Sequence, residues 1–316
     1  MMTIIVTSYS TKRLPGIERL LESLKSQSIH DYEIIYVVEG SEDLVRGIRD
    51  AMNELGVKGR ILKSSKGLGL AGARNEGLRE ASGEIVCFID DDVILSRGWC
   101  SAIVEAFATI PEISGATGPA YPIWSKGQMN WLPFQLDWLI GCTGWFTSNQ
   151  PVEVTNVWGM NMCFSRRVLR SPEGFLGGSG MAKGRISGTV GEDVEISARI
   201  RRGGGHLYYL PHMAVYNSID ESRLSFAFIL ERSVRVGRDR GFFADWKSVV
   251  LASAPESRIL VSLGGEVFGR LTGRQHLSFG ERARTLSVTI VALLGVSIGF
   301  FAGRLEPHKM CSRHLS

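Results

Sequence analysis

The sequence lacks cysteine pairs of the kind that bind zinc or build a disulfide framework. Its five cysteines are widely spaced, and none occurs in a Cys-x-x-Cys arrangement. This excludes a zinc ribbon and favours a reducing compartment. The chain also has little net charge, +4 over 316 residues, and no dense basic run, so nucleic acid is not an expected partner. The N-terminus shows no secretory pattern and leads directly into a strand pattern.

Short apolar runs alternate with helix-like repeats through most of the chain. Hydrophobic residues make up 44% and charged residues 22%, which is ordinary globular usage. The predicted strands cover residues 3–8, 33–38, 60–63, 85–89, 157–164, 207–211 and 214–216. The predicted helices cover residues 17–28, 41–55, 73–81, 96–109 and 192–201. This alternation predicts an α/β fold in which a mostly parallel, doubly wound sheet is flanked by helices.

An acidic triplet ends the predicted strand at residues 85–89. The strand is almost wholly apolar, and it is followed at once by Asp90, Asp91 and Asp92. Three adjacent carboxylates repel one another unless a cation offsets their charge, and hard divalent ions prefer oxygen ligands. Ligands of open α/β sheets also bind at the carboxyl ends of strands. The triplet by itself fits either a metal site or an acidic turn that caps the next helix.

A glycine pattern before the triplet resembles a dinucleotide-binding fingerprint. Gly67-x-Gly-x-x-Gly72 has the required spacing, and an acidic residue follows about twenty residues later at Asp90. However, the first glycine of that fingerprint follows its strand directly, whereas residues 64–66 intervene here. The pattern therefore disfavours an NAD site. A second glycine cluster at residues 177–180 lacks the spacing of a nucleophile elbow and indicates a loop.

Residues 120–150 have a different composition from their surroundings. Four tryptophans recur every seven residues in this segment, at positions 124, 131, 138 and 145, but Pro133 and several glycines interrupt any long helix. Two interpretations remain open. The segment either covers part of the core or lies at a membrane–water boundary, where tryptophan is favoured.

Arginines recur every three residues at positions 232, 235 and 238. On a helix they would form one basic stripe. Such a stripe suits a phosphate or pyrophosphate, and Arg235 is the expected donor contact. The alternative is an ordinary solvated helix face.

Residues 285–303 contain no charged side chain. A segment of this length can cross the hydrocarbon core of a bilayer. Gly295, Gly299 and Gly303 would form a small-residue packing face. The segment favours membrane association, although a buried helix, or a hairpin with residues 249–268, fits the same pattern. Arginines on both sides leave the orientation undecided by charge. Because no export signal precedes the chain, we expect the catalytic domain on the cytoplasmic face of the cell membrane.

Several short motifs follow one another in a fixed order over residues 3–217. They are Thr7-Ser-Tyr9, Glu39-Gly-Ser41, Lys66-Gly-Leu-Gly69, Ala73-Arg-Asn75, Phe88-Ile-Asp-Asp-Asp92, Gly159-Met-Asn161 and Gly191-Glu-Asp193. Taken together and in this order, they resemble a family 2 glycosyltransferase of the GT-A fold. The resemblance implies a Rossmann-like sheet flanked by helices, with a C-terminal apolar helical segment added to it here.

The resemblance also implies roles for individual residues. Asp193, with Glu192 beside it, matches the general base. Asp92 and Asp90 match the metal-binding pair. The place where many members have a histidine metal ligand falls on Asn217 or Tyr216, and Asn217 is the expected ligand. The residues expected to bind the nucleotide-sugar, or to line its site, are Thr7, Ser8, Tyr9, Glu39, Lys66, Arg74, Asn75, Asp90, Asp91, Gly159 and Asn161.

The expected activity is an inverting, metal-dependent transfer from a nucleotide-sugar to an acceptor. Mg²⁺ or Mn²⁺ is the expected metal, a UDP-sugar the first expectation for the donor, and a lipid-linked or cell-surface glycan the expected acceptor. Residues 1–235 are the expected catalytic domain, with residues 120–150 as an insertion, and residues 236–316 form a helical, membrane-associated region. The alternatives are a sugar nucleotidyltransferase and a non-catalytic membrane scaffold with a degenerate transferase domain.

Overall fold

The computed structural model divides into two compact units. It describes residues 1–64, 67–124, 129–143, 146–169, 174–175, 191–243, 255–272 and 277–305. The first unit comprises Met1–Pro122 and Phe146–Ser218, and the second comprises Ile123–Trp145 and Ile219–Ser316. The expected domains, residues 1–235 and 236–316, stay a prediction beside this division, which places residues 123–145 and 219–235 in the second unit.

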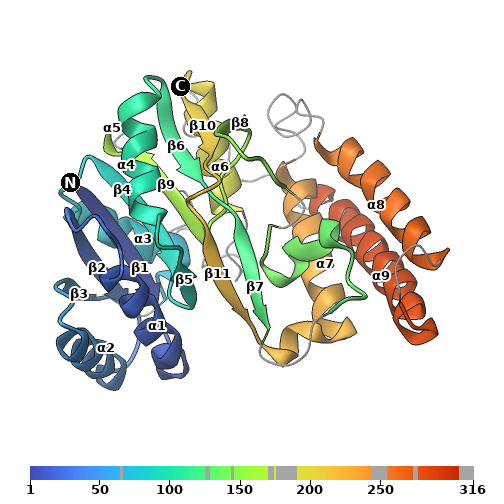
Figure 1. The fold of residues 1–316 in the computed structure, drawn as a ribbon, viewed down its shortest axis with the longest axis horizontal. Coiled ribbons are helices and arrows are strands. Elements are labelled where there is room, and N and C mark those ends of the chain that lie inside the picture. The colour runs from blue at the N-terminus through green and yellow to red at the C-terminus, as the bar shows by residue number, and fades with distance from the viewer. Residues whose placement is uncertain are drawn as a thin grey trace. The chain divides into compact units, whose positions relative to one another are not determined.

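An eight-stranded mixed sheet forms the centre of the first unit (Figure 1). Its order is β3 (Arg60–Lys63), β2 (Tyr32–Val38), β1 (Met2–Ser8), β4 (Ile85–Asp90), β9 (Asn161–Ser165), β6 (Ile113–Thr117), β10 (His206–Tyr209) and β8 (Val152–Val154). The first four strands are parallel, as expected. However, β9 runs antiparallel to both β4 and β6. The direction of a strand depends on how the chain returns to the sheet, which its apolar pattern does not record.

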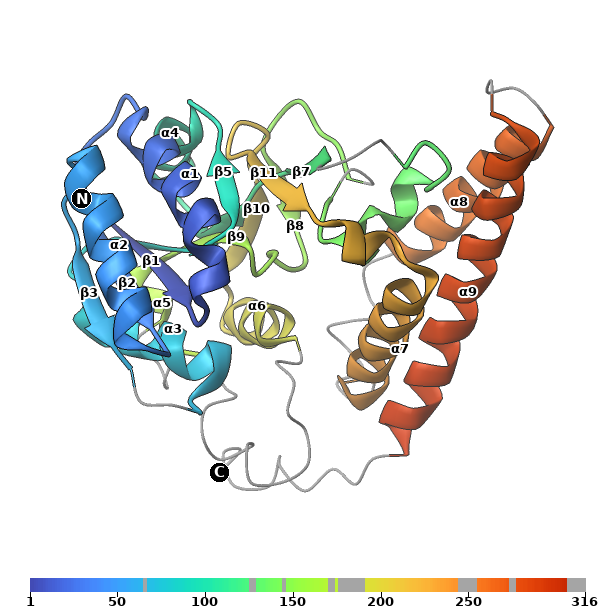
Figure 2. The ribbon, with the colours of Figure 1, turned by 90° about the horizontal axis from the view of Figure 1, so that it is seen from below.

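Helices cover both faces of this sheet (Figures 1 and 2). One layer contains α1 (Leu14–Lys25), α2 (Glu42–Leu55) and α4 (Trp99–Thr109), and the other contains α3 (Gly69–Glu80), α5 (Arg166–Leu169) and α6 (Glu192–Arg202). Alternate residues of β1 serve the two layers, because Ile4 and Val6 pack with the first layer whereas Ile5 packs with the second. This two-sided burial explains why the strands appear as continuous apolar runs.

The start of α3 differs from the prediction. The helix begins at Gly69 rather than at residue 73, so the Gly67–Gly72 pattern contains the first helical turn. Farther along, a Cβ at Gly77 would lie 2.6 Å from Ile5 Cγ2, so glycine allows α3 to approach β1 closely. A second sheet was also missed: β5 (Val93–Leu95), β11 (Val215–Ile219) and β7 (Ala120–Trp124) pair in that order. With only three residues, β5 is too short for a periodic signal.

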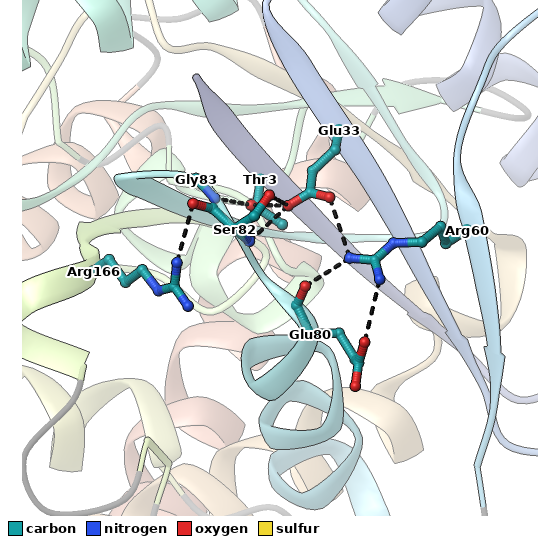
Figure 3. A network of polar contacts seen from close by, with 7 residues as sticks. All are labelled: Thr3, Glu33, Arg60, Glu80, Ser82, Gly83 and Arg166. Atoms are coloured by element: carbon teal, nitrogen blue, oxygen red, sulfur yellow. Dashed lines mark hydrogen bonds and ion pairs between the residues drawn. The ribbon is translucent and has the colours of Figure 1, made fainter.

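A polar network ties together the amino ends of the first strands (Figure 3). Glu33 Oε1 accepts hydrogen bonds from Thr3 Oγ1 at 2.7 Å and from the Ser82 amide at 2.7 Å. Glu33 Oε2 accepts from Arg60 Nη2 at 3.2 Å, and Arg60 also donates to the Glu80 carbonyl at 2.6 Å. One carboxylate thus connects β1, β2, β3 and the turn before β4, at the end of the sheet away from the acidic triplet.

Replacing Glu33 with glutamine is expected to lower the free energy of unfolding by about 1–3 kcal/mol at pH 7, because the hydrogen bonds to a charged acceptor are lost. Burial opposes ionisation, but the hydrogen bonds from Ser82 and Thr3 and the charge of Arg60 lower the pKa of Glu33 from 4.5 to about 2. Its contribution is therefore complete above about pH 4.5 and disappears as the pH falls towards 2. Urea unfolding at pH 7 and pH 3 measures this, and a wild-type–variant difference that does not shrink at pH 3 would contradict it.

The second unit packs three long helices around the tryptophan-rich segment. They are α7 (Phe226–Phe243), α8 (Pro255–Leu271) and α9 (Phe279–Arg304), and the shorter elements are η2 (Phe134–Ile140) and η3 (Glu221–Leu224). Trp131 is 9% exposed and stacks on Phe226 at 6.2 Å between ring centroids. Leu139 is fully buried in the same cluster. Residues 129–143 of the segment therefore cover a core.

The apolar segment at residues 285–303 is helical, as expected, and lies within α9. Ser278 and Glu281 form a capping box at its start. Among the described residues, α9 alone is long and apolar enough to cross a membrane by length and composition.

Candidate active site

The three carboxylates of the acidic triplet have different surroundings. Asp91 is 3% exposed, and its carboxylate accepts hydrogen bonds from Ser8 Oγ at 2.5 Å and Arg13 Nη1 at 2.9 Å. Burial raises the pKa of Asp91, and Arg13 and the Ser8 hydroxyl oppose that rise. Ser8 and Asp91 bind each other and join the ends of β1 and β4. Their expected contact with the nucleotide stays a prediction.

Arg13 is a site residue that the sequence analysis missed. Its Nη1 also contacts Asp92 Oδ2 at 2.6 Å, and its guanidinium lies 5.4 Å from the centre of the Tyr9 ring. The signal that would have found it is strand adjacency. Thr7 of β1 pairs with Asp90 of β4, so the turn after β1 has to lie beside the triplet. Arg13 supplies positive charge where the carboxylates repel one another.

Arg74 connects the acidic triplet to the start of α6. The side chain is buried, and its Nη1 donates to Glu192 Oε1 at 2.7 Å. Its Nη2 donates to the Gly159 carbonyl at 2.7 Å and lies 3.6 Å from Asp90 Oδ1. Arg74 therefore brings together the end of β4, the turn before β9 and the first residue of α6.

Asn75, another expected site residue, binds the backbone of Phe175. Its side-chain amide donates to the Phe175 carbonyl and accepts from the Phe175 N–H, each at 2.8 Å. The Phe175 ring in turn lies 5.6 Å from the Arg74 guanidinium. Asn75 thus holds the Phe175 backbone beside Arg74, and its expected contact with the nucleotide stays a prediction.

Asp193 lies at the start of α6, next to the residue that Arg74 holds. Its Oδ2 accepts a hydrogen bond from the Gly159 amide at 3.0 Å, and its Oδ1 accepts from the Val194 amide at 2.9 Å. Burial and the neighbouring Glu192 raise the pKa of Asp193 to about 6, although the Gly159 hydrogen bond and Arg74 act in the opposite direction. A carboxylate with this pKa is ionised at neutral pH and accepts a proton more readily than an ordinary aspartate.

Three of the expected nucleotide contacts surround the carboxyl ends of β1 and β2. Thr7 is half-buried between Asp90 and Val37 in the sheet register. Tyr9 is 66% exposed. Glu39 accepts a hydrogen bond from the Gly67 amide at 2.5 Å, which ties the end of β2 to the turn before α3. Lys66 lies outside the described residues.

Three other expected site residues lie in three different parts of the structure. Asn161 is fully buried, and its amide bonds Trp99 Nε1 at 2.9 Å and the Met213 carbonyl at 2.7 Å, so it holds the core together. Asn217 pairs with Val93 between β11 and β5, one residue beyond Asp92. Arg235 belongs to α7 in the second unit, where it contacts Glu231 at 2.5 Å.

The described residues contain no cluster of three or more histidine, cysteine, aspartate or glutamate side chains that could hold a metal ion. Asp90 and Asp92 are the two carboxylates of the triplet that keep appreciable exposure, 40% and 19% of the side chain. Magnesium commonly uses one or two protein carboxylates and takes its other ligands from water and substrate phosphates. Arg13 Nη1 lies 2.6 Å from Asp92 Oδ2, so positive charge is already accommodated beside this carboxylate. The pair therefore fits a metal ion that is completed by a bound diphosphate.

Solved structures with a similar fold are glycosyltransferases. A mannosyltransferase from Pyrobaculum calidifontis, solved with GDP-Man and Mn²⁺, is 16% identical with a TM-score of 0.59, and the match covers 96% of this chain and 86% of that one. GalNAc-T7, solved with UDP, GalNAc and Mn²⁺, is 17% identical with a TM-score of 0.53, and the match covers 69% and 43%. These likenesses confirm the GT-A fold expected from the sequence.

Sequence comparison agrees with the fold. A glucosyl-dolichyl phosphate glucuronosyltransferase of Haloferax volcanii is 23% identical over 73% of this chain and 74% of that protein. The succinoglycan biosynthesis protein ExoM of Rhizobium meliloti is 23% identical over 91% of this chain and 89% of that protein. The family model for glycosyl transferase family 2 matches residues 3–171, which is more than half of the chain. The chain therefore belongs to glycosyl transferase family 2.

Proposed function

We propose that this glycosyltransferase moves a sugar from a nucleotide-sugar donor to an acceptor hydroxyl with inversion at the anomeric carbon. One observation carries the proposal. The buried Arg74 guanidinium lies 3.6 Å from Asp90 and 2.7 Å from Glu192, so it joins the acidic triplet to the residue that precedes Asp193. Two acidic groups about a hundred positions apart in the sequence are thereby held at one place. Such an arrangement suits a reaction with a leaving group on one side and a proton acceptor on the other.

The protein side of the reaction follows from these contacts. Asp193 accepts the proton of the acceptor hydroxyl as the new glycosidic bond forms, and the nucleoside diphosphate leaves. The Gly159 amide and the start of α6 fix the orientation of the Asp193 carboxylate. Thr7, Tyr9 and Glu39 provide polar contacts for the nucleoside at the ends of β1 and β2.

Asp92 and Asp90, with the Asn217 side chain as a further oxygen ligand, would hold a divalent ion. When bound, the ion neutralises charge on the diphosphate leaving group. The similar solved structures contain Mn²⁺, one of them with a guanosine nucleotide and the other with UDP. A UDP-sugar remains our first expectation for the donor, with Mg²⁺ or Mn²⁺ as the metal.

The proposed acceptor is a hydroxyl of a lipid-linked or cell-surface glycan, reached at the cytoplasmic face of the cell membrane. The relative from Haloferax volcanii is named for a dolichyl-phosphate substrate. The exposed apolar side chains of α9 give this chain a means of binding a membrane. Residues 236–316 remain the proposed membrane-associated region.

Donor binding tests the metal part of the proposal. In the presence of Mn²⁺, a saturating UDP or UDP-sugar is expected to raise Tm by about 5 °C, because a ligand that binds only the native state stabilises it. Asp92→Asn should remove the metal-dependent part of that shift. Asp50→Asn, which makes the same change on the exposed surface of α2, should preserve it. Equal shifts in both variants would contradict the assignment of Asp92, and release of pyrophosphate during turnover would indicate nucleotidyl transfer instead.

A further inference from the structure

Two helices of the second unit, α7 and α9, touch at their backbones (Figure 2). A Cβ added to Gly299 would lie 2.0 Å from the Val234 carbonyl oxygen. A Cβ on Gly241 would lie 2.0 Å from the Phe300 carbonyl oxygen, so side chains larger than hydrogen are excluded on both helices. This contact, the glycine seam, is completed by Gly237 against Val296 and by Gly295 against Ser233. The small-residue face expected on α9 thus has its partner within the same chain.

The seam fixes the relative direction of the two helices. The residue numbers of the contacting positions increase together along the two helices, from Ser233 with Gly295 to Gly241 with Phe300. The helices are therefore parallel, with α7 beside the apolar half of α9 rather than beyond its ends. Any membrane depth that this part of α9 reaches is reached by α7 as well.

Charged residues make α7 unsuitable for the interior of a bilayer. The part of α7 that runs beside α9 carries Glu231, Arg232, Arg235 and Arg238. The Glu231 and Arg235 side chains are 68% and 49% exposed, so they face away from the protein core. Ionised groups inside the hydrocarbon are costly, and α7 does not qualify as a membrane span by length and composition. If α9 crossed the membrane, the charged side chains of α7 would enter the hydrocarbon as well.

The face of α9 opposite the seam is apolar and exposed. It carries Leu286, Ile290, Leu293, Leu294, Ile298 and Phe301, which are 42–67% exposed. The buried positions Val288, Ala292, Gly295, Gly299 and Gly303 repeat at the same helical spacing on the other side. Arg284 and Arg304 lie near the two ends of the apolar face and are both exposed. This combination of an apolar stripe with arginines at its ends suits a surface that contains anionic lipid.

We infer that α9 lies in the plane of an anionic membrane surface and does not cross the bilayer. The inference rests on the membrane association proposed above and specifies its form. The apolar face enters the headgroup boundary, the glycine seam keeps α7 on the protein side, and both ends of α9 stay on the face that carries the catalytic unit.

The side of the membrane on which the C-terminus lies tests this inference. The full chain with an epitope tag after Ser316 is expressed in a bacterial host, and its membranes are prepared as spheroplasts and as inverted vesicles. Protease should remove the tag in inverted vesicles and leave it intact in spheroplasts, as it does for the catalytic unit. Removal of the tag in spheroplasts would show that α9 spans the membrane and would overturn the inference while leaving membrane association intact. Recovery of the chain in the soluble fraction would instead refute the association itself.

The lipid-facing residues are tested with a matched pair of variants. Leu294→Glu with Ile298→Glu should reduce binding to vesicles of equal phosphatidylglycerol and phosphatidylcholine at least tenfold. Val104→Glu, a similar change at an exposed position of α4, should leave binding unchanged. Circular dichroism and an unchanged Tm establish that the double variant is folded. Equal binding of the unmodified protein to pure phosphatidylcholine would refute the requirement for anionic lipid, and unchanged binding of the double variant would refute the docking face.

Discussion

Replacing Asp193 with asparagine is expected to lower kcat for sugar transfer by about 10²–10⁴-fold, which is the usual contribution of a positioned general base. The donor KM should change little, because the Asp193 carboxylate binds the backbone amides of Gly159 and Val194 rather than a side chain expected to hold the nucleotide. Asparagine keeps the size of the side chain and an oxygen that accepts the Gly159 hydrogen bond. The loss is then one of proton affinity rather than of structure. Steady-state kinetics with a purified acceptor measure it.

The pH dependence provides a second measure of the same role. The pKa of Asp193 is raised to about 6, mainly by burial and next by Glu192. The wild-type rate should therefore rise with pH through about 6, as the carboxylate loses its proton and becomes able to act as a base. In Asp193→Asn this acid limb should disappear, whereas Asp50→Asn should keep it. A wild-type-like rate and pH profile in Asp193→Asn would exclude the base role, as would be expected for an acceptor phosphate that is already ionised.

The local features of the fold follow from the sequence. The strands β1, β2 and β4 were predicted because apolar runs record burial on both faces. Ser41 was predicted as a helix N-cap, and its side chain accepts a hydrogen bond from the Leu44 amide. Glu192 and Asp193 were predicted to begin a helix, as they do in α6. In each case the signal lies within a few residues of the element that it specifies.

The side-chain partners could not be obtained in this way. Ser8 and Asp91 are 83 positions apart, and only the pairing of β1 with β4 brings the hydroxyl to the carboxylate. The motif that contains Asn75 gives no sign that its amide binds Phe175, a hundred positions away. A motif records the type of residue that a fold requires at one position. It does not record which of several polar groups in the folded chain will take up that residue's hydrogen bonds.

Among these long-range contacts, those of Arg74 are expected to contribute most to the stability of the fold. Replacing it with methionine is expected to lower the free energy of unfolding by about 3–5 kcal/mol, because the Glu192 carboxylate, only 10% exposed, would remain charged without its partner. The Gly159 carbonyl would also lose its hydrogen bond. Tm should fall by about 10 °C, and transfer should be lost because the start of α6 is no longer held beside β4. Thermal unfolding followed by circular dichroism measures the first effect.

Two further variants separate a specific role of Arg74 from a general effect of removing an arginine. Arg79→Met makes the same change at an exposed position of α3, and it should alter stability by less than about 0.5 kcal/mol. Adding Glu192→Gln to Arg74→Met should recover part of the lost stability, since the glutamine leaves no unpaired charge in the buried site. If the changes in unfolding free energy caused by the two substitutions are instead additive, the Arg74–Glu192 contact does not join the triplet to α6. The geometric basis for placing Asp193 opposite Asp90 and Asp92 would then be removed.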